Sequence, residues 1–222
     1  CQNYEISHLM EGGEVTSDQM AGMMIRLARQ GCHNINFVTP THVVPQILEG
    51  LVAAIEQGLN VPLVYNSSGY DRKETIELLD GIFDIYMPDF KFWDKKWSKR
   101  FCNAPDYRNV ATEAIKEMHR QVGDLVLDSQ GIAQRGLLIR HLVMPEGVAG
   151  TKEIMEFIAG DISPNTYVNV MDQYRPCGTA SQDQYIDRRL TAREYRDAVD
   201  AARKAGLNRL DPRDRVRLIF GL

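Results

Sequence analysis

The chain has 222 residues, of which 44% are hydrophobic and 25% charged, and its formal net charge is −4. This composition fits a globular protein with a buried core and argues against a nucleic-acid or anionic-membrane partner. No apolar run approaches the ~20 residues of a membrane-spanning helix, and no secretory or transit segment is visible. The cysteines, Cys1, Cys32, Cys102 and Cys177, are too few and too widely spaced for a disulfide scaffold. We therefore expect a cytoplasmic protein in which the last three are free thiols.

Helical and strand patterns alternate along the chain. A helix is expected over 16–31, with Met20, Met23, Met24 and Leu27 at helical spacing, and a second over 43–58. Ile47, Leu48, Leu51 and Ile55 are predicted to share one face of the second helix. Further helices are expected over 71–81, 106–123, 150–160 and 190–206. Capping boxes are predicted for two of them, from the pairs Asp71/Glu74 and Thr191/Glu194.

Five short segments between these helices read as strands: 34–39, 61–66, 84–90, 135–145 and 166–174. They are apolar nearly throughout, which indicates burial on both faces and a parallel sheet with right-handed crossovers. The predicted fold class is α/β, a partial (β/α)6 TIM-like open barrel whose first strand is missing from this chain, in a single domain over 1–222. Eight units would not fit this length.

Two other segments break the alternation. Residues 91–101, "KFWDKKWSKRF", are expected to be a basic, aromatic loop on a solvated face, with partner or substrate contact as the second interpretation. Residues 123–136 resemble a hairpin with a polar turn, added to the barrel rather than part of it.

Polar residues follow or end each predicted strand, at the edge where parallel α/β sheets bind ligands. They are Thr39, Thr41, His42, Asn66, Ser68, Asp89, Lys91, Arg140, Asn169, Asp172, Gln173 and Tyr174. Buried charge is costly unless it is paired or used, so this set predicts a site.

Structural interpretations stand beside this one. His42 could cap the following helix. Asp89 and Lys91 lie two apart on one strand face and could form a structural ion pair, and Arg140 could neutralise Asp89 or Asp172. His141 alternates with Arg140 and is expected to face the helix layer or to occupy a core position with its hydrogen bonds satisfied, rather than to be a ligand. His33 and His119 are expected at the surface.

Several segments are similar to a known family. "CQNYEIS" resembles the end of the Cys-x-x-x-Cys-x-x-Cys motif of radical S-adenosylmethionine enzymes. The segments "PLVYNSSGYD", "DGIFDIYMPDFK", "GIAQRGLLIRHLVMP" and "VNVMDQYRP" resemble the group similar to the pyruvate formate-lyase activating enzyme. The resemblance covers most of the chain.

The resemblance implies a 4Fe–4S cluster held by three thiolates, with S-adenosylmethionine on the open iron. One electron would then release a 5′-deoxyadenosyl radical that abstracts a hydrogen atom. Cys1 would be the third cluster ligand, and the other two would lie three and seven residues upstream, outside this chain. "EGGE" at 11–14 is taken as a loop rather than the family's Gly-Gly-Glu segment.

The same resemblance assigns cofactor-binding positions, all toward S-adenosylmethionine. Tyr4 would lie near the adenine, and Thr39, Thr41 and His42 would replace the Gly-Gly-Glu segment. Asn66 stands where activating enzymes have an aspartate, and "PDFK" places Asp89 and Lys91 in the cofactor site. Ser68 suits ribose hydroxyls. Arg140 would contact the cofactor, and Gln173 and Tyr174 would close over the adenine.

Four functions are compatible with these residues. The first is activation of a glycyl-radical protein partner, with flavodoxin or ferredoxin as electron donor. The second is radical chemistry on another substrate. The third is a non-radical barrel enzyme with Lys91 as a Schiff-base nucleophile. The fourth is a cluster-free scaffold or binding domain, which is also how this fragment alone would behave.

Overall fold

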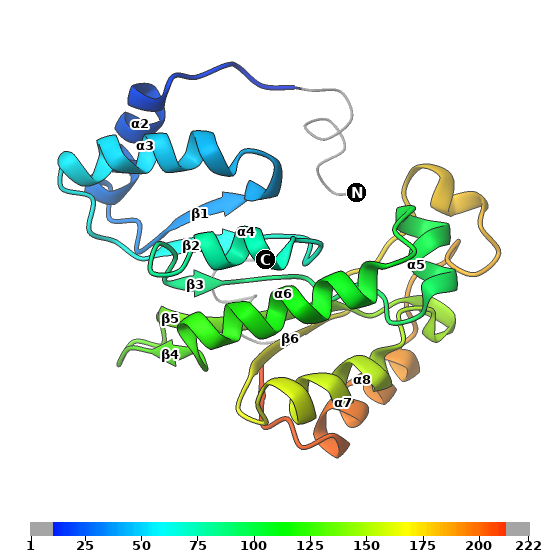
Figure 1. Ribbon diagram of the computed structural model, residues 1–222. Coiled ribbons are helices and arrows are strands. Elements are labelled where there is room, and N and C mark those ends of the chain that lie inside the picture. The colour runs from blue at the N-terminus through cyan, green and yellow to red at the C-terminus, as the bar shows by residue number, and fades with distance from the viewer. Residues whose placement is uncertain (1–10, 212–222) are drawn as a thin grey trace. The chain divides into compact units, whose positions relative to one another are not determined.

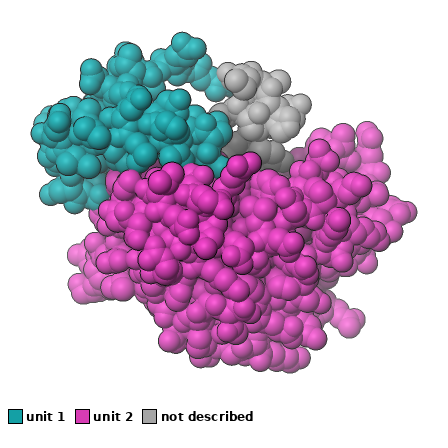
Figure 2. Space-filling model, viewed as in Figure 1, with its two compact units in different colours: residues 1–35, 40–61 teal, residues 36–39, 62–222 magenta. Residues whose placement is uncertain are grey.

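The computed structural model describes residues 11–211, and Cys1 and Tyr4 lie outside this range. The chain divides into two compact units, coloured separately in Figure 2. In the described range, unit 1 comprises residues 11–35 and 40–61, and unit 2 comprises residues 36–39 and 62–211. The single-domain organisation stays a prediction. No described helix is long and apolar enough to cross a membrane.

Unit 1 is a helical pair. It contains α2 (Ser17–Arg29), the 3-10 turn η1 (Pro40–His42) and α3 (Val44–Glu56). Thr16 caps α2 in a capping box with Gln19, and the buried residues of α2 are Ala21, Met24 and Ile25. Of the four residues predicted at helical spacing, Met24 is buried, whereas Met23 and Leu27 remain 41% and 42% exposed. The contact face of α2 runs through small Ala21 instead, which allows close helix packing.

The core face of α3 is also rotated from the prediction. Ile47, Gly50, Leu51 and Ala54 are buried, whereas Ile55 is exposed. Gly50 fits under the Met20 side chain, since a Cβ there would lie 3.0 Å from the Met20 methyl carbon. Small residues thus mark the faces on which α2 and α3 pack, and the spacing of the large apolar residues alone does not identify these faces.

Unit 2 holds the sheet, an open and mostly parallel α/β arrangement with interleaved helices (Figure 1). The strands are β1 (Ile35–Val38), β2 (Leu63–Asn66), β3 (Ile85–Tyr86), β4 (Val126–Leu127), β5 (Ala133–Leu142), β6 (Tyr167–Met171) and β7 (Arg209–Leu210). Their order is β1-β2-β3-β5-β6-β7, and β4 pairs antiparallel with β5. The five predicted strands and the predicted 123–136 hairpin are confirmed, whereas the two-residue β7 was not predicted.

The helices of unit 2 are α4 (Lys73–Leu78), α5 (Lys95–Cys102), α6 (Tyr107–Val122), α7 (Thr151–Phe157) and α8 (Ala192–Lys204). Helix α6 packs on β3 and β5, and α7 packs on α8. The predicted loop over 91–101 is wrong, because α5 occupies most of it. Asp94 caps α5 by accepting a hydrogen bond from Lys96 N at 2.6 Å, and Asn103 ends the helix in a left-handed conformation.

Strand β5 shows how the sheet separates two environments. Leu137, Ile139 and His141 are fully buried, while the alternating Leu138 and Arg140 are only partly buried. Strand β5 pairs with β6 so that Arg140 lies opposite Asn169. The pleat therefore places Arg140 and Asn169 on one face and His141 on the other.

Candidate functional site

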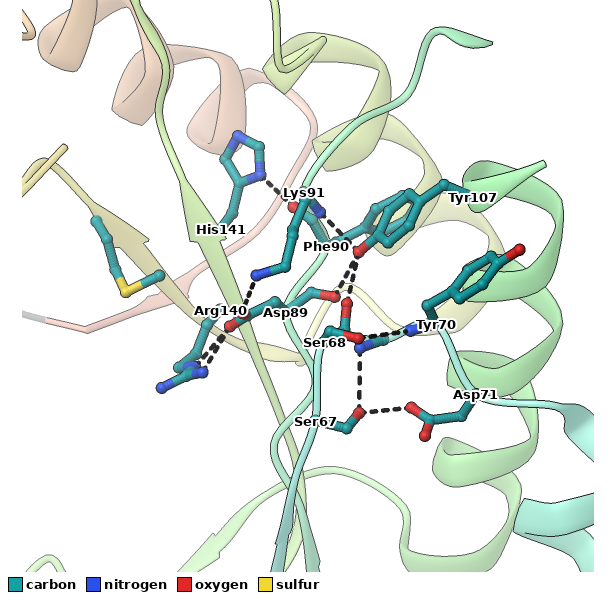
Figure 3. A network of polar contacts seen from close by, with 12 residues as sticks. Ser67, Ser68, Tyr70, Asp71, Asp89, Phe90, Lys91, Tyr107, Arg140 and His141 are labelled. Atoms are coloured by element: carbon teal, nitrogen blue, oxygen red, sulfur yellow. Dashed lines mark hydrogen bonds and ion pairs between the residues drawn. The ribbon is translucent and has the colours of Figure 1, made fainter. Parts of the chain in front are cut away.

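An ion-pair cluster lies where β3 and β5 reach their carboxyl ends (Figure 3). Arg140 Nε and Nη2 lie 2.8 and 2.7 Å from Asp89 Oδ1, and Lys91 Nζ contacts Asp89 Oδ2. A parallel bridge between Asp89 and Arg140 aligns the two backbones. The predicted pairings of Asp89 with Lys91 and with Arg140 are confirmed.

The cluster has a surplus of positive charge, because it contains two cations and one carboxylate. Two cations share the Asp89 carboxylate, whose side chain is only 15% exposed, while Lys91 and Arg140 are 35% and 27% exposed. No described residue accepts a hydrogen bond from Arg140 Nη1, and Asp89 engages only one of the three Lys91 ammonium donors. These free donors can bind a carboxylate or another anionic group.

The Tyr107 hydroxyl, from the first turn of α6, fixes the backbone around the cluster. It accepts a hydrogen bond from Lys91 N at 2.9 Å and lies 2.8 and 3.0 Å from the carbonyl oxygens of Ser68 and Asp89. Burial raises the pKa of Tyr107 well above its usual value, so the hydroxyl keeps its proton and donates it to these carbonyls. No spacing or motif in the sequence singles out this residue.

A second set of contacts orders the loop after β2. Ser67 Oγ donates to Asp71 Oδ2 at 2.6 Å and accepts from Gly69 N at 3.1 Å, and Tyr65 donates to Asp71 Oδ1 at 3.0 Å. The predicted Asp71/Glu74 capping box is therefore wrong: the N-cap of α4 is Arg72, without a side-chain cap. The Asp71 carboxylate is 1% exposed and instead accepts hydrogen bonds from side chains at the end of β2 and in the loop that follows it.

His141 supports the cluster from the helix side of β5. Its Nδ1 lies 2.7 Å from the carbonyl oxygen of Phe90, which can only accept, so Nδ1 carries the proton. Its Nε2, 2.9 Å from Thr151 Oγ1, then accepts the hydroxyl proton. Burial lowers the pKa of His141 to about 4, which keeps the ring neutral. The prediction that His141 faces the helix layer is confirmed.

The remaining predicted site residues of unit 2 have simpler surroundings. Asn66 is 5% exposed at the end of β2, and no described residue hydrogen-bonds its side chain. The Ser68 hydroxyl accepts from Tyr70 N at 3.4 Å. Gln173 is exposed and donates to Met171 Sδ at 3.4 Å, while Tyr174 donates to the carbonyl oxygen of Ile186 at 2.7 Å.

Residues from the segment after β1 fall in both units. Thr39 is half-buried in unit 2, whereas Thr41 and exposed His42 lie in η1 of unit 1. The interpretation of His42 as a helix cap is wrong, because α3 has Val43 at its N-cap and no side-chain cap. The predicted roles of Cys1 and Tyr4 concern residues outside the described range.

The described cysteines are free thiols. Cys32 is half-buried, and Cys102 and Cys177 are exposed. Over residues 11–211, no three His, Cys, Asp or Glu side chains are grouped so that they could hold a metal ion.

Comparison with known proteins finds a curated relative of this chain. The chain is 33% identical over 218 residues to the uncharacterized protein MJ0674 of Methanocaldococcus jannaschii. The match covers 94% of this chain and 59% of that protein, so the chain spans less than two thirds of its relative's length. No protein-family model matches the chain.

Proposed function

We propose that this chain is part of a radical S-adenosylmethionine enzyme that activates a glycyl-radical protein, with flavodoxin or ferredoxin supplying the electron. In this proposal the open α/β sheet is a partial (β/α)6 TIM-like barrel. The observation that supports it best is the Asp89–Lys91–Arg140 cluster at the carboxyl edge of the sheet, with its surplus positive charge and free donors.

The donor set fits S-adenosylmethionine. Its carboxylate matches Lys91 and Arg140, and its ribose hydroxyls match the Asp89 carboxylate, the Asn66 amide and the Ser68 hydroxyl. Asn66 is only 5% exposed and its side chain has no hydrogen-bond partner among the described residues, which leaves the amide available to a ligand. When bound, the 4Fe–4S cluster and S-adenosylmethionine would supply hydrogen-atom abstraction, and Cys1 would be one cluster thiolate.

The protein's own groups have separate tasks in this proposal. Asp89 pairs with both cations and holds them beside each other, ready for the anion. Tyr107 and Gly69 set the positions of the Asp89 and Lys91 backbones, and His141 holds the Phe90 carbonyl between them. Preorganised donors of this kind cost little reorganisation when the ligand binds.

The alternative with Lys91 as a Schiff-base nucleophile has weaker support. A nucleophilic amine must be unprotonated, whereas the ion pair with Asp89 requires the ammonium form. Borohydride trapping of Lys91 with a carbonyl substrate would favour this alternative.

The test uses the protein expressed with the coding sequence that precedes Cys1. It is reconstituted anaerobically with iron and sulfide, reduced, and examined by electron paramagnetic resonance with and without S-adenosylmethionine. We expect a reduced-cluster signal that shifts with the cofactor, and release of 5′-deoxyadenosine. A cluster indifferent to the cofactor, or the lack of cysteines three and seven positions before Cys1, would contradict the proposal.

The partner is tested separately. Formation of a glycyl radical in an added glycyl-radical protein would support activation. Product formation from another substrate without any protein partner would assign the chain to the second radical function instead.

A further inference from the structure

Helix α5 carries a concentrated positive charge on a protein whose net charge is negative. Its residues Lys95, Lys96, Lys99 and Arg100, which we call the α5 basic surface, are all exposed, and the helix contains no acidic residue. Among the described residues, the acidic side chains that form hydrogen bonds with α5 are Asp94, at the N-cap, and Asp183, bound to Arg100. The surface therefore keeps a formal charge of +2, from four basic and two acidic groups.

Two of these lysines are unfavourably placed within the helix, whereas Lys99 and Arg100 lie in its last turn, where the helix dipole favours basic residues. Lys95 and Lys96 occupy the first turn, where the helix dipole favours acidic residues, and the first turn of α5 has none. Among the described residues, neither Lys95 nor Lys99 forms an ion pair, and Lys96 instead lies 4.3 Å from the Trp97 ring centroid. Lysines in the first turn lower the stability of the helix, so their presence is better explained by a role in binding a partner than by a role in folding.

The basic surface rests on a rigid aromatic support. The Trp97 and Phe101 rings stack with their centroids 5.7 Å apart, and the edge contact of Trp97 with Tyr185 has a centroid distance of 4.8 Å. Arg100 Nε binds Asp183 at 2.8 Å, which ties α5 to the segment after β6 that runs beside it in Figure 1. A preorganised surface loses less side-chain entropy when a partner binds.

The chemistry of this surface distinguishes between two kinds of polyanion. Nucleic-acid binding by aromatic side chains requires ring faces on which bases can stack. Here Trp97 and Phe101 cover each other, Lys96 lies over Trp97, and Tyr185 braces its edge. Trp, Tyr and Arg beside charged rim residues are instead the composition of protein–protein contacts.

We propose that the α5 basic surface binds an acidic surface of a partner protein. The surface begins four residues after Lys91, so the partner would bind beside the carboxyl edge of the sheet. This inference does not depend on the cluster chemistry, because charge complementarity alone carries it.

The test measures binding of fluorescein-labelled poly-L-glutamate of about 20 residues to the 222-residue chain by anisotropy at low salt. The test variant is Lys95→Glu/Lys96→Glu/Lys99→Glu, which leaves the Arg100–Asp183 pair intact. The control, Arg193→Glu/Arg196→Glu/Lys204→Glu on α8, changes the net charge equally at exposed positions. Circular dichroism checks that each variant is folded, and Lys95→Gln/Lys96→Gln/Lys99→Gln provides a milder substitution should the reversal fail to fold.

We expect the α5 reversal to weaken binding about tenfold or more and to flatten its salt dependence, with less than a twofold effect in the control. Equal losses in both variants would show that only net charge matters and would overturn the proposal. Tighter binding of a (dT)20 oligonucleotide than of poly-L-glutamate would also overturn it, and would indicate a nucleic-acid partner. None of these outcomes bears on the electron paramagnetic resonance test above.

Discussion

Gly69 and Asp89 approach each other so closely that a Cβ on Gly69 would lie 2.1 Å from the Asp89 carbonyl oxygen. Gly69 also has a φ of +75°, a conformation that residues with a side chain rarely adopt. The loop after β2 and the segment after β3 are thus in direct backbone contact, and this contact helps to position the carboxylate that binds Lys91 and Arg140.

Replacing Gly69 tests this contact. We expect Gly69→Ala to lower the free energy of unfolding by more than about 2 kcal/mol, because it combines backbone strain with a steric clash. The matched control is Gly81→Ala, at a φ of +81° but with no atom within 4 Å of the added Cβ, which should cost about 1 kcal/mol. Urea denaturation measures both. Equal losses would mean that the loop moves away from Asp89 freely.

Tyr107→Phe removes the hydroxyl that serves three backbone groups. We expect a loss of about 1–3 kcal/mol in the free energy of unfolding, since Lys91 N and two carbonyl groups lose a buried partner. Tyr70 stacks on Tyr107 with ring centroids 6.0 Å apart, but its hydroxyl binds Asp106 in an exposed position. Tyr70→Phe should therefore cost under about 0.5 kcal/mol, and a similar cost in both variants would argue against the role of Tyr107.

Arg140→Met tests the proposed anion site. Loss of a charge-assisted hydrogen bond to the carboxylate of S-adenosylmethionine should raise Kd roughly tenfold or more, measured by calorimetry on the reconstituted protein. Arg193→Met, which removes a cation from an 86%-exposed side chain on α8, should leave Kd unchanged. An unchanged Kd in Arg140→Met would show that Arg140 does not bind S-adenosylmethionine.

Asp89→Asn leaves Lys91 and Arg140 beside each other without their shared counter-charge. We expect the variant to lose about 1–3 kcal/mol of unfolding free energy. In Asp89→Asn/Lys91→Met one of the facing cations is gone, so the double variant should lose less than the sum of the two single losses. Additive losses in chemical denaturation would show that the ion pairs are not coupled.

The buried neutral His141 predicts an acid-sensitive stability. Its pKa is about 4 in the folded protein, whereas an unfolded histidine titrates near 6.5. As the pH falls from about 6.5 toward 4, the unfolded state binds a proton that the folded state does not, so stability is lost across that window. The expected loss from this group is about 2 kcal/mol by pH 5.

Comparison with variants isolates this effect from other titrating groups. His141→Gln should be less stable at pH 7 yet lose about 2 kcal/mol less than the wild type between pH 7 and pH 5. His33→Gln, at an exposed position, is the matched histidine-to-glutamine control. Parallel curves for the wild type and His141→Gln would rule out His141 as the source.

The strand ends were predictable from the sequence because alternating strand and helix patterns leave little topological choice. Parallel strands necessarily bring Asp89 and Arg140 to one edge, and two-residue spacing brings Lys91 to the same face. The Thr191/Glu194 capping box was equally local and is confirmed, with Thr191 accepting from Glu194 N at 3.2 Å.

The predictions from sequence failed where contacts with distant residues, rather than the local sequence pattern, determine the structure. Asp71 satisfies the pattern of a helix cap, but Ser67 and Tyr65 offer it buried hydrogen bonds. Helix α5 was hidden by its charged and aromatic composition, although Asp94 was a usable start signal. Tyr107 had no local signal, because its three backbone partners come from distant segments.

The hairpin of β4 and β5 lies far along the strand from Arg140, yet it controls what Arg140 can do. A shift of β5 by one residue would turn Arg140 into the dry helix layer and expose His141 on the charged face, since strand side chains alternate. The pairing of Val126 with Arg135 and of Leu127 with Ala133, together with the irregularity between them, opposes such a slip. The short β4–β5 hairpin thus fixes the register of β5, and this register keeps Arg140 on the charged face of the sheet and His141 on the buried face.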